Sequence, residues 1–124
     1  MEFKIDTKET FSVITPLSNQ IDAILSGELH LKCDYLRQIG SNNYIVDLSL
    51  GKTIDNGGIS GFIELHEYIY SLNNSLAFTG MSPDILKVLK KGEHDLLLNI
   101  APKMEEAIDI ISMEILERDL LGEE

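Results

Sequence analysis

The sequence predicts an α/β fold: one small mixed sheet with an N-terminal hairpin, parallel crossover units and about four flanking helices. The chain opens with two alternating apolar segments that are typical of a hairpin. Short apolar strands then alternate with helical segments, and short turns join them. No linker, repeat or low-complexity stretch interrupts this order, so we expect a single domain over residues 1–124.

The first third of the chain contains the hairpin and one helix. Residues 3–6 and 11–15 form the two predicted strands, and an extended piece is expected over residues 20–25. We predict that a helix follows with Ser26 as its N-cap and ends at Gly40. The predicted apolar positions of this helix are Leu29, Cys33, Leu36 and Ile39.

The middle of the chain supplies the predicted central strand and the second helix. Residues 44–48 are short, rich in β-formers and almost continuously apolar, which is typical of a strand buried on both faces. A glycine-rich segment over residues 55–58 opens the second helix, which is expected to begin near Gly57. Its predicted apolar face consists of Ile59, Phe62, Ile63, His66, Ile69 and Tyr70.

The last third begins with a second buried strand, predicted over residues 76–79. Ser82 and Pro83 are an N-cap and a proline at the first helical position, so a third helix is expected there, ending in the lysine cluster of residues 87–91. Residues 96–98 are three leucines and are predicted as a last short strand.

A long closing helix is predicted to begin near Lys103, with acidic residues in its first turn. Its first half is expected to pack on the sheet. Residues 112–124 are a candidate C-terminal helical extension, in which Leu116, Leu120 and Leu121 would meet a partner or a second copy of the chain in a homodimer.

Composition argues against several classes of function. The chain has 21 acidic and 10 basic residues and a formal net charge of -11, which repels phosphate backbones and anionic lipids. We therefore expect no nucleic-acid partner and no direct membrane insertion.

The sequence shows no secretory signal and no apolar run of membrane-spanning length, and Cys33 is its one cysteine, so a cytoplasmic location and a small buried thiol are expected.

No residue pattern predicts a metal site, a cofactor or catalysis. Glu64, His66 and Glu67 lie too close together on one helix to converge on a metal ion, and neither His30 nor His94 has a partner at metal-ligand spacing. We expect His66 to be packed or half-buried. Three aspartates, Asp22, Asp47 and Asp55, are predicted to be turn or cap residues because no activated nucleophile accompanies them.

Several spaced motifs resemble the STAS domain family, of the anti-sigma factor antagonist type. Residues 45–49 (Ile-Val-Asp-Leu-Ser) and 53–59 (Thr-Ile-Asp-Asn-Gly-Gly-Ile) are similar to a strand ending in Asp-Leu-Ser followed by Asp-Ser-Ser-Gly-Leu. Residues 21–23 (Ile-Asp-Ala) resemble the family's Leu-Asp-Ala turn. Residues 78–82, 99–102 and 105–107 resemble its later strand and helix starts, so the resemblance covers nearly the whole chain.

The resemblance implies a non-enzymatic regulatory module that binds an anti-sigma factor or a serine kinase-like protein. The partner surface that it implies consists of Asp22, Asp55, Asn56, Gly57, Gly58 and Ile59. In phosphorylatable members the first serine of the motif accepts phosphate, and Asn56 stands at that position. We expect Asn56 to cap its helix and to act as an unmodified serine would, because an amide cannot be phosphorylated as a hydroxyl is.

Two other functions stay open. In the first, the protein is a STAS subunit that serves as a structural or regulatory piece of a larger assembly, such as a phospholipid transporter or a stress-sensing complex. A small-ligand or nucleotide-binding role for the glycine-rich helix start is weaker, because residues 55–59 match neither the P-loop nor the dinucleotide pattern.

Overall fold

The computed structural model describes residues 2–122 and contains one main sheet of five strands, in the order β1-β2-β4-β6-β7. The first strand, β1, is antiparallel to β2, and the remaining neighbours run parallel. A separate two-stranded sheet pairs β3 with β5. The strands are β1 (Phe3–Thr7), β2 (Ser12–Pro16), β3 (Gln20–Ile21), β4 (Tyr44–Asp47), β5 (Thr53–Ile54), β6 (Leu76–Thr79) and β7 (Ile100–Ala101).

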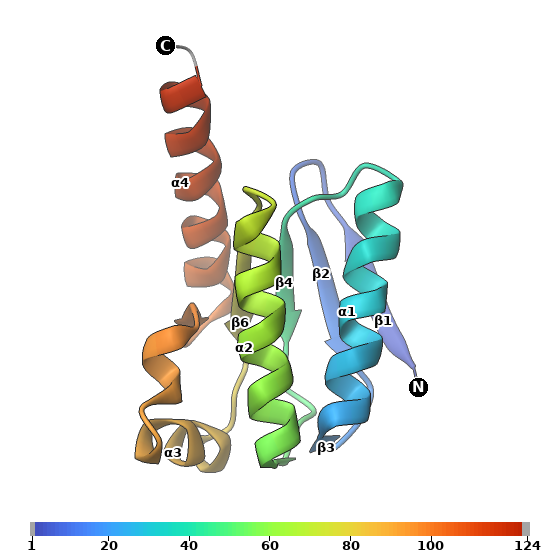
Figure 1. Ribbon diagram of the computed structural model, residues 1–124, viewed down its shortest axis with the longest axis vertical. Helices are drawn as coiled ribbons and strands as arrows, with labels where there is room; N and C mark the ends of the chain where they lie inside the picture. Colours follow the sequence, from blue (N-terminus) through green and yellow to red (C-terminus); the bar gives the residue numbers. More distant parts are fainter. Residues whose placement is uncertain (1, 123–124) are drawn as a thin grey trace.

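Helices cover both faces of the main sheet. Along β4 and β6, alternate residues point to opposite faces: Val46 and Phe78 pack with α1 and α2, whereas Ile45 and Ala77 pack with α4. Figure 1 shows α1 and α2 side by side along the sheet and α3 at one end. The helices are α1 (Ala23–Gln38), α2 (Asn56–Ser71), α3 (Pro83–Lys91) and α4 (Met104–Gly122), with a 3₁₀ turn, η1 (His94–Leu97).

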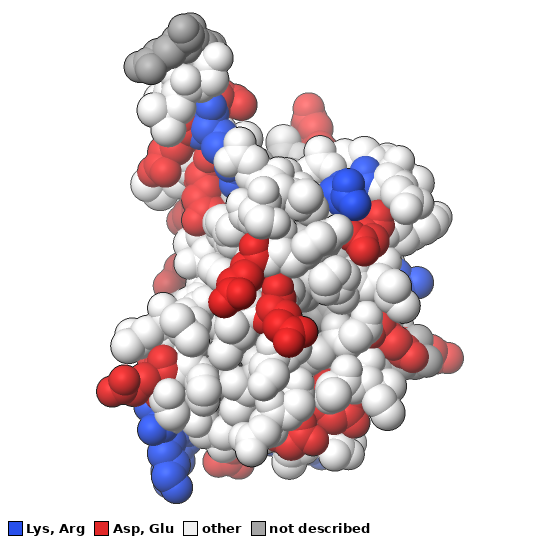
Figure 2. Space-filling view, in the orientation of Figure 1, with Lys and Arg blue, Asp and Glu red and all other residues white. Residues whose placement is uncertain are grey.

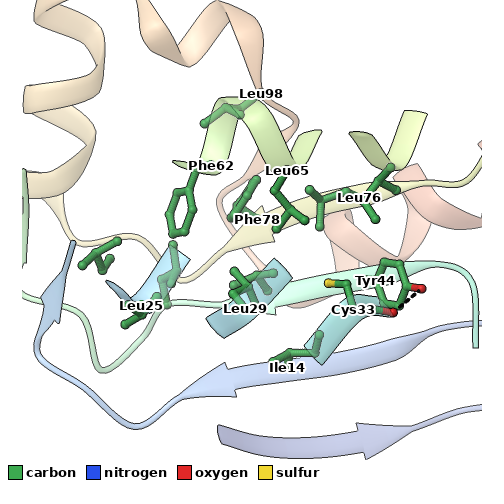
Figure 3. Packing of buried hydrophobic residues seen from close by; sticks show 14 of the residues in the cluster. Ile14, Leu25, Leu29, Cys33, Tyr44, Phe62, Leu65, Leu76, Phe78 and Leu98 are labelled. Atoms are coloured by element: carbon green, nitrogen blue, oxygen red, sulfur yellow. Dashed lines mark hydrogen bonds between the residues drawn. The ribbon is translucent and has the colours of Figure 1, made fainter. Parts of the chain in front are cut away.

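The larger core lies between the sheet and helices α1 and α2, as Figure 3 shows. Phe62 of α2 and Phe78 of β6 are fully buried, and their ring centroids lie 4.6 Å apart. Cys33 is buried as expected, and burial raises the pKa of its thiol. The hydroxyl of buried Tyr44 is satisfied by carbonyl oxygens, at 3.0 Å from that of Cys33 and 2.8 Å from that of Ser41.

Most predicted elements are present. The hairpin, the central strand β4 and the strand β6 are confirmed, and Ser82 caps α3 with Pro83 at the first helical position. The predicted end of α1 is also confirmed, because Gly40 follows it with a positive φ of 98°. Two details of the predicted faces differ: Ile39 is exposed, and Leu65, which was missed, is fully buried in α2.

The predicted start of the first helix is wrong. Its N-cap is Asp22 rather than Ser26, and Asp22 accepts a hydrogen bond from the Leu25 N–H at 2.9 Å. Only Gln20 and Ile21 of the expected extended piece form a strand. Ser26 lies inside the helix, buried, where its hydroxyl donates to the Gly58 carbonyl of α2 at 3.2 Å.

The predicted strand over residues 96–98 is also wrong. Leu96 and Leu97 lie in the 3₁₀ turn and are 77% and 53% exposed, and only Leu98 is buried. The last strand is β7, which pairs with Phe78 and Thr79 at the end of β6. Three successive leucines indicated burial on both faces, but here the chain turns before it reaches the sheet.

A group of polar side chains attaches α4 to the start of β6, which β7 does not reach. We call Tyr70, Ser75, Asn99, Glu114 and Arg118 the polar clamp. The Tyr70 hydroxyl donates to the Glu114 carboxylate at 2.6 Å and accepts from the Leu76 N–H at 3.3 Å. The Asn99 amide donates to the Tyr70 hydroxyl and, at 3.3 Å, to the Leu76 carbonyl, while Arg118 donates to Ser75. Side chains thus satisfy the edge of β6 where no strand pairs with it.

Candidate functional site

The short sheet formed by β3 and β5 brings two helix starts together. Gln20 pairs with Thr53 and Ile21 with Ile54, so the residues that follow, Asp22 and Asp55, occupy equivalent positions. The Asp55 N–H donates to the Ile21 carbonyl at 3.1 Å and extends this register by one residue. Helices α1 and α2 therefore begin side by side at one end of the molecule, near β3 in Figure 1.

Both aspartates cap their helices, which confirms the prediction that they are turn or cap residues. The Asp22 carboxylate accepts from the Leu25 N–H, and the Asp55 carboxylate accepts from the Gly58 N–H, each at 2.9 Å. A negative charge at this position also favours the helix dipole. Asp47 acts similarly in a turn, where it accepts from the Ser49 N–H at 3.0 Å.

Asn56 is not the cap that the sequence predicted. It is the first residue of α2, and Asp55 is the N-cap with φ -108° and ψ -179°. The bond between the Asp55 N–H and the Ile21 carbonyl keeps residue 55 extended as the cap, so the helix begins at residue 56, one residue earlier than expected for an Asn56 cap. The Asn56 side chain is exposed at the helix start and is free of a capping role.

Gly57 and Gly58 permit close contact between the two helix starts. A Cβ on Gly57 would lie 3.0 Å from the Cβ of Ala23, and a Cβ on Gly58 would lie 2.9 Å from the carbonyl carbon of Ile21. Backbone atoms cannot move aside as a flexible side chain can. Close packing therefore explains why both positions are glycine.

The contact continues along the two helices through residues that the sequence reading missed. A Cβ on Gly61 would overlap the Ser26 side chain, so the absence of a side chain there lets α1 and α2 approach closely. Gly57 and Gly61 are four residues apart and therefore share one side of α2. That spacing of small residues was the available signal for this contact.

A hollow of about 270 Å³ lies between the two helices beside this contact. Small residues of both helices form most of its wall, and His30, Ser60 and Glu64 contribute the larger polar groups. Its full lining is Ala23, Ser26, Gly27, His30, Gly57, Ser60, Gly61 and Glu64, which includes no Lys or Arg.

The residues predicted for partner binding differ in accessibility. Asp55 and Asn56 are exposed and Asp22 is partly exposed, whereas Gly58 is buried and Ile59 is 4% exposed within the core. We call Asp22, Asp55, Asn56 and Gly57 the helix-start surface. Gly58 and Ile59 lie beneath it and support its shape.

The starts of α1 and α2 carry acidic side chains. Helices α1 and α2 each begin with an aspartate cap, and Glu64 adds a further carboxylate to the wall of the hollow. Figure 2 shows acidic side chains spread over the face that carries α2; one group of basic side chains lies at the lower left, where Figure 1 places α3, and others lie at the upper left and upper right.

The histidine and carboxylate positions do not form a metal centre among residues 2–122, where no group of three or more His, Cys, Asp or Glu side chains is placed to hold an ion. His66 is half-buried against Tyr70, with ring centroids 4.5 Å apart. Burial lowers the pKa of His66, and the nearby carboxylates of Glu114 and Glu67 partly oppose this effect.

The three-dimensional structure is similar to solved anti-sigma factor antagonists. One from Thermotoga maritima is 17% identical, with a TM-score of 0.73 over 89% of this chain and 94% of that one. The antagonist SpoIIAA in its unphosphorylated form is 17% identical, with a TM-score of 0.67 over 90% of this chain and 96% of that one. These likenesses confirm the predicted fold.

Two further structures place the same fold in different settings. A variant of RsbS from Moorella thermoacetica is 15% identical, with a TM-score of 0.71 over 90% of this chain and 96% of that one. The murine anion transporter Slc26a9 is 14% identical, with a TM-score of 0.66 over 83% of this chain but 18% of the transporter.

No protein-family model and no curated protein matches the sequence. No helix within residues 2–122 is long and apolar enough to cross a membrane.

Proposed function

We propose that the protein is a non-enzymatic regulatory module that binds an anti-sigma factor or a related serine kinase-like protein through the helix-start surface. The observation that carries this proposal is the juxtaposition of two capped helix starts, with Asp55 and Asn56 exposed beside a hollow of about 270 Å³. A partner side chain can enter the hollow while its neighbours contact Asn56. The similar folds of anti-sigma factor antagonists support this class of partner.

Asn56 keeps the proposed module in one binding state, because an amide cannot be phosphorylated as a hydroxyl is. SpoIIAA has been solved in both unphosphorylated and phosphorylated forms, so that protein carries phosphate in one of its states. Here the position resembling the phosphoacceptor carries an exposed neutral amide. A phosphate would add roughly -1.5 to -2 charges next to Asp55, and Asn56 avoids this change. We therefore propose that partner binding is not switched off at residue 56.

A phosphate-containing ligand fits the same surface poorly. A helix N-terminus attracts anions, but Asp22 and Asp55 already occupy the capping positions, and Glu64 adds a third carboxylate nearby. The lining of the hollow contains no Lys or Arg to offset these charges. This arrangement favours a protein partner over a nucleotide.

The likeness to Slc26a9 favours one alternative, in which the protein is a subunit of a larger assembly. The similar fold forms 18% of that transporter chain, so it also occurs as one part of a larger protein. Such a role uses the fold as a structural or regulatory piece. Affinity purification from the native cell separates the alternatives, because a kinase-like protein supports the main proposal and transporter or stress-complex subunits support the other.

Binding calorimetry with the purified partner tests the surface directly. Asn56→Asp places a charge in the contact and should weaken binding by about a hundredfold, equivalent to about 2.7 kcal/mol of mismatched electrostatics. Its melting temperature should stay close to that of the wild type, because an acidic residue in the first turn favours the helix dipole. Asn56→Ser should bind normally.

Asn42→Asp is the matched control, since it adds the same charge at an exposed asparagine in the loop after α1, far from the helix starts. It should bind as the wild type does. Equal affinities for all of these variants would place the binding surface elsewhere.

If the partner is a kinase, incubating it with ATP and the protein tests whether the segment around residue 56 can be phosphorylated. Mass spectrometry should find no phosphate on residues 55–59, because this segment contains no hydroxyl side chain. A phosphate on Ser60, Ser49 or Thr53 that weakens binding would show that a switch has moved to another position.

A further inference from the structure

The outer face of α4 carries an apolar stripe that no residue between 2 and 122 covers. Met113, Leu116 and Leu120 are 62%, 58% and 60% exposed. Their spacings of three and four residues place them along one side of the helix. Solvated leucines in isolation are ordinary, but three in a row on one helix face are typical of a contact surface.

The opposite side of α4 is the one that the rest of the molecule holds. Ala107 and Ile111 are fully buried against the sheet, and Glu114 and Arg118 belong to the polar clamp. The stripe therefore stays exposed when α4 is docked. Figure 1 shows that the C-terminal part of α4 extends past the sheet and the neighbouring helices, so this face is open along its length.

Acidic residues surround the stripe. Glu106, Asp109, Glu117 and Asp119 are all exposed on α4. The helix has one basic residue, Arg118, and its guanidinium is directed to Ser75 and lies 3.9 Å from the Glu114 carboxylate. The exposed side of α4 thus combines an apolar stripe with uncompensated negative charge.

We propose that this side of α4 binds a basic amphipathic helix of a second protein partner. Leucine-like side chains of that helix would pack on Met113, Leu116 and Leu120, and its Lys or Arg side chains would pair with the flanking carboxylates. A second copy of this chain fits less well, because two α4 faces would bring like charges together.

The proposal goes beyond the helix-start surface: the two surfaces lie at opposite ends of the molecule, so one chain can bridge two proteins.

A synthetic helix of about 18 residues, with Leu on one face and Lys on the other, is a suitable probe. Fluorescence anisotropy should show that it binds the wild-type protein and that added salt weakens the complex. Leu116→Gln/Leu120→Gln should raise its Kd by at least about tenfold, because two apolar contacts are lost. Gln forms helices about as well as Leu, so circular dichroism should be unchanged.

Leu31→Gln/Leu96→Gln is the matched control, because these leucines are 68% and 77% exposed on other elements. It removes the same apolar groups without touching α4 and should leave the Kd unchanged. Equal Kd values for both double variants would overturn the proposal, as would equal binding of a probe with Glu in place of Lys. Sedimentation showing a wild-type dimer that Leu116→Gln/Leu120→Gln abolishes would assign the stripe to self-association instead and overturn it.

Discussion

Helices α2 and α4 are attached to the sheet in different ways. The shorter helix, α2, has five buried residues, and its glycines let it pack closely on α1 and β3. The longer helix, α4, has two buried residues, and hydrogen bonds of the polar clamp supplement their packing. Close packing determines the position of α2 and so shapes the helix-start surface. Attachment along one side leaves the other side of α4 free for a partner.

The largest effect should follow from filling the contact beneath α2. Gly58→Ala places a Cβ 2.9 Å from the Ile21 carbonyl carbon, closer than real Cβ atoms approach backbone. The helix start must shift, and we expect the free energy of unfolding to fall by about 2–4 kcal/mol in urea titrations.

Gly27→Ala is the control for this substitution. Gly27 also lies in a helix, but a Cβ there would meet nothing within 4 Å. It should stabilise the protein by about 0.5–1 kcal/mol, because alanine has the higher helix propensity. Similar gains in both variants would mean that helix propensity, rather than contact with β3, decides the effect of a substitution at Gly58.

Removing one oxygen from the polar clamp should have the next largest effect. Tyr70→Phe leaves the Leu76 N–H, the Asn99 amide and the Glu114 carboxylate without the hydroxyl that they share. The expected loss is about 1–3 kcal/mol of unfolding free energy, with faster hydrogen exchange in α4 than in α2. Tyr35→Phe, at a 55% exposed tyrosine, should change stability by less than about 0.5 kcal/mol.

The clamp also predicts how Tyr70 titrates. Burial, and then its hydrogen bond to Glu114, raises the pKa of Tyr70 to about 12. Its hydroxyl therefore stays protonated and can donate at any physiological pH. Spectroscopic titration that assigns Tyr70 an ordinary pKa near 10 would contradict the clamp geometry.

A smaller effect distinguishes the two residues at the start of α2. Asp55→Ala removes the cap that the Gly58 N–H uses and should cost about 1 kcal/mol in the free energy of unfolding. Asn56→Ala should be neutral or stabilise by up to about 0.5 kcal/mol, because residue 56 is already helical. Thermal unfolding of the two variants should rank them in this order, and the reverse order would restore Asn56 as the cap.

The smallest effect concerns pH. Because burial lowers the pKa of His66 in the folded protein, the unfolded chain binds its proton more readily. The stability that neutral His66 contributes is complete above the ordinary histidine pKa of about 6.5 and is lost as the pH falls below it. Urea unfolding at several pH values should show a shallower decline for His66→Gln than for the wild type. Parallel declines would show that His66 does not contribute.

Much of the fold could be predicted from short-range patterns. The apolar runs of β4 and β6 and the Ser82–Pro83 helix start carry their signals within a few residues. The missed features depend on distant partners. Residue 55 is held extended by the carbonyl of Ile21, and the hydroxyl of Ser26 bonds to Gly58 of another helix.

The candidate site also combines features that local sequence signals predict with features that depend on distant residues. Asp22 and Asp55 were identified as cap or turn residues because Asp at such positions satisfies backbone donors. Their adjacency was not visible in the sequence, because it results from the pairing of β3 with β5. The burial of Ile59, the hollow and the close approach of Gly61 to Ser26 also require the two helices to be packed together.

By itself, the sequence determined the class of fold, the order of its main elements and the negative charge of the chain, because these depend on local periodicity and composition. Tertiary structure alone decided which residue caps each of the first two helices and which leucines are buried. It also decided which face of α4 stays open. The physical reason is that a cap, a buried leucine or a free helix face depends on what lies opposite it, and residues far along the chain supply that partner.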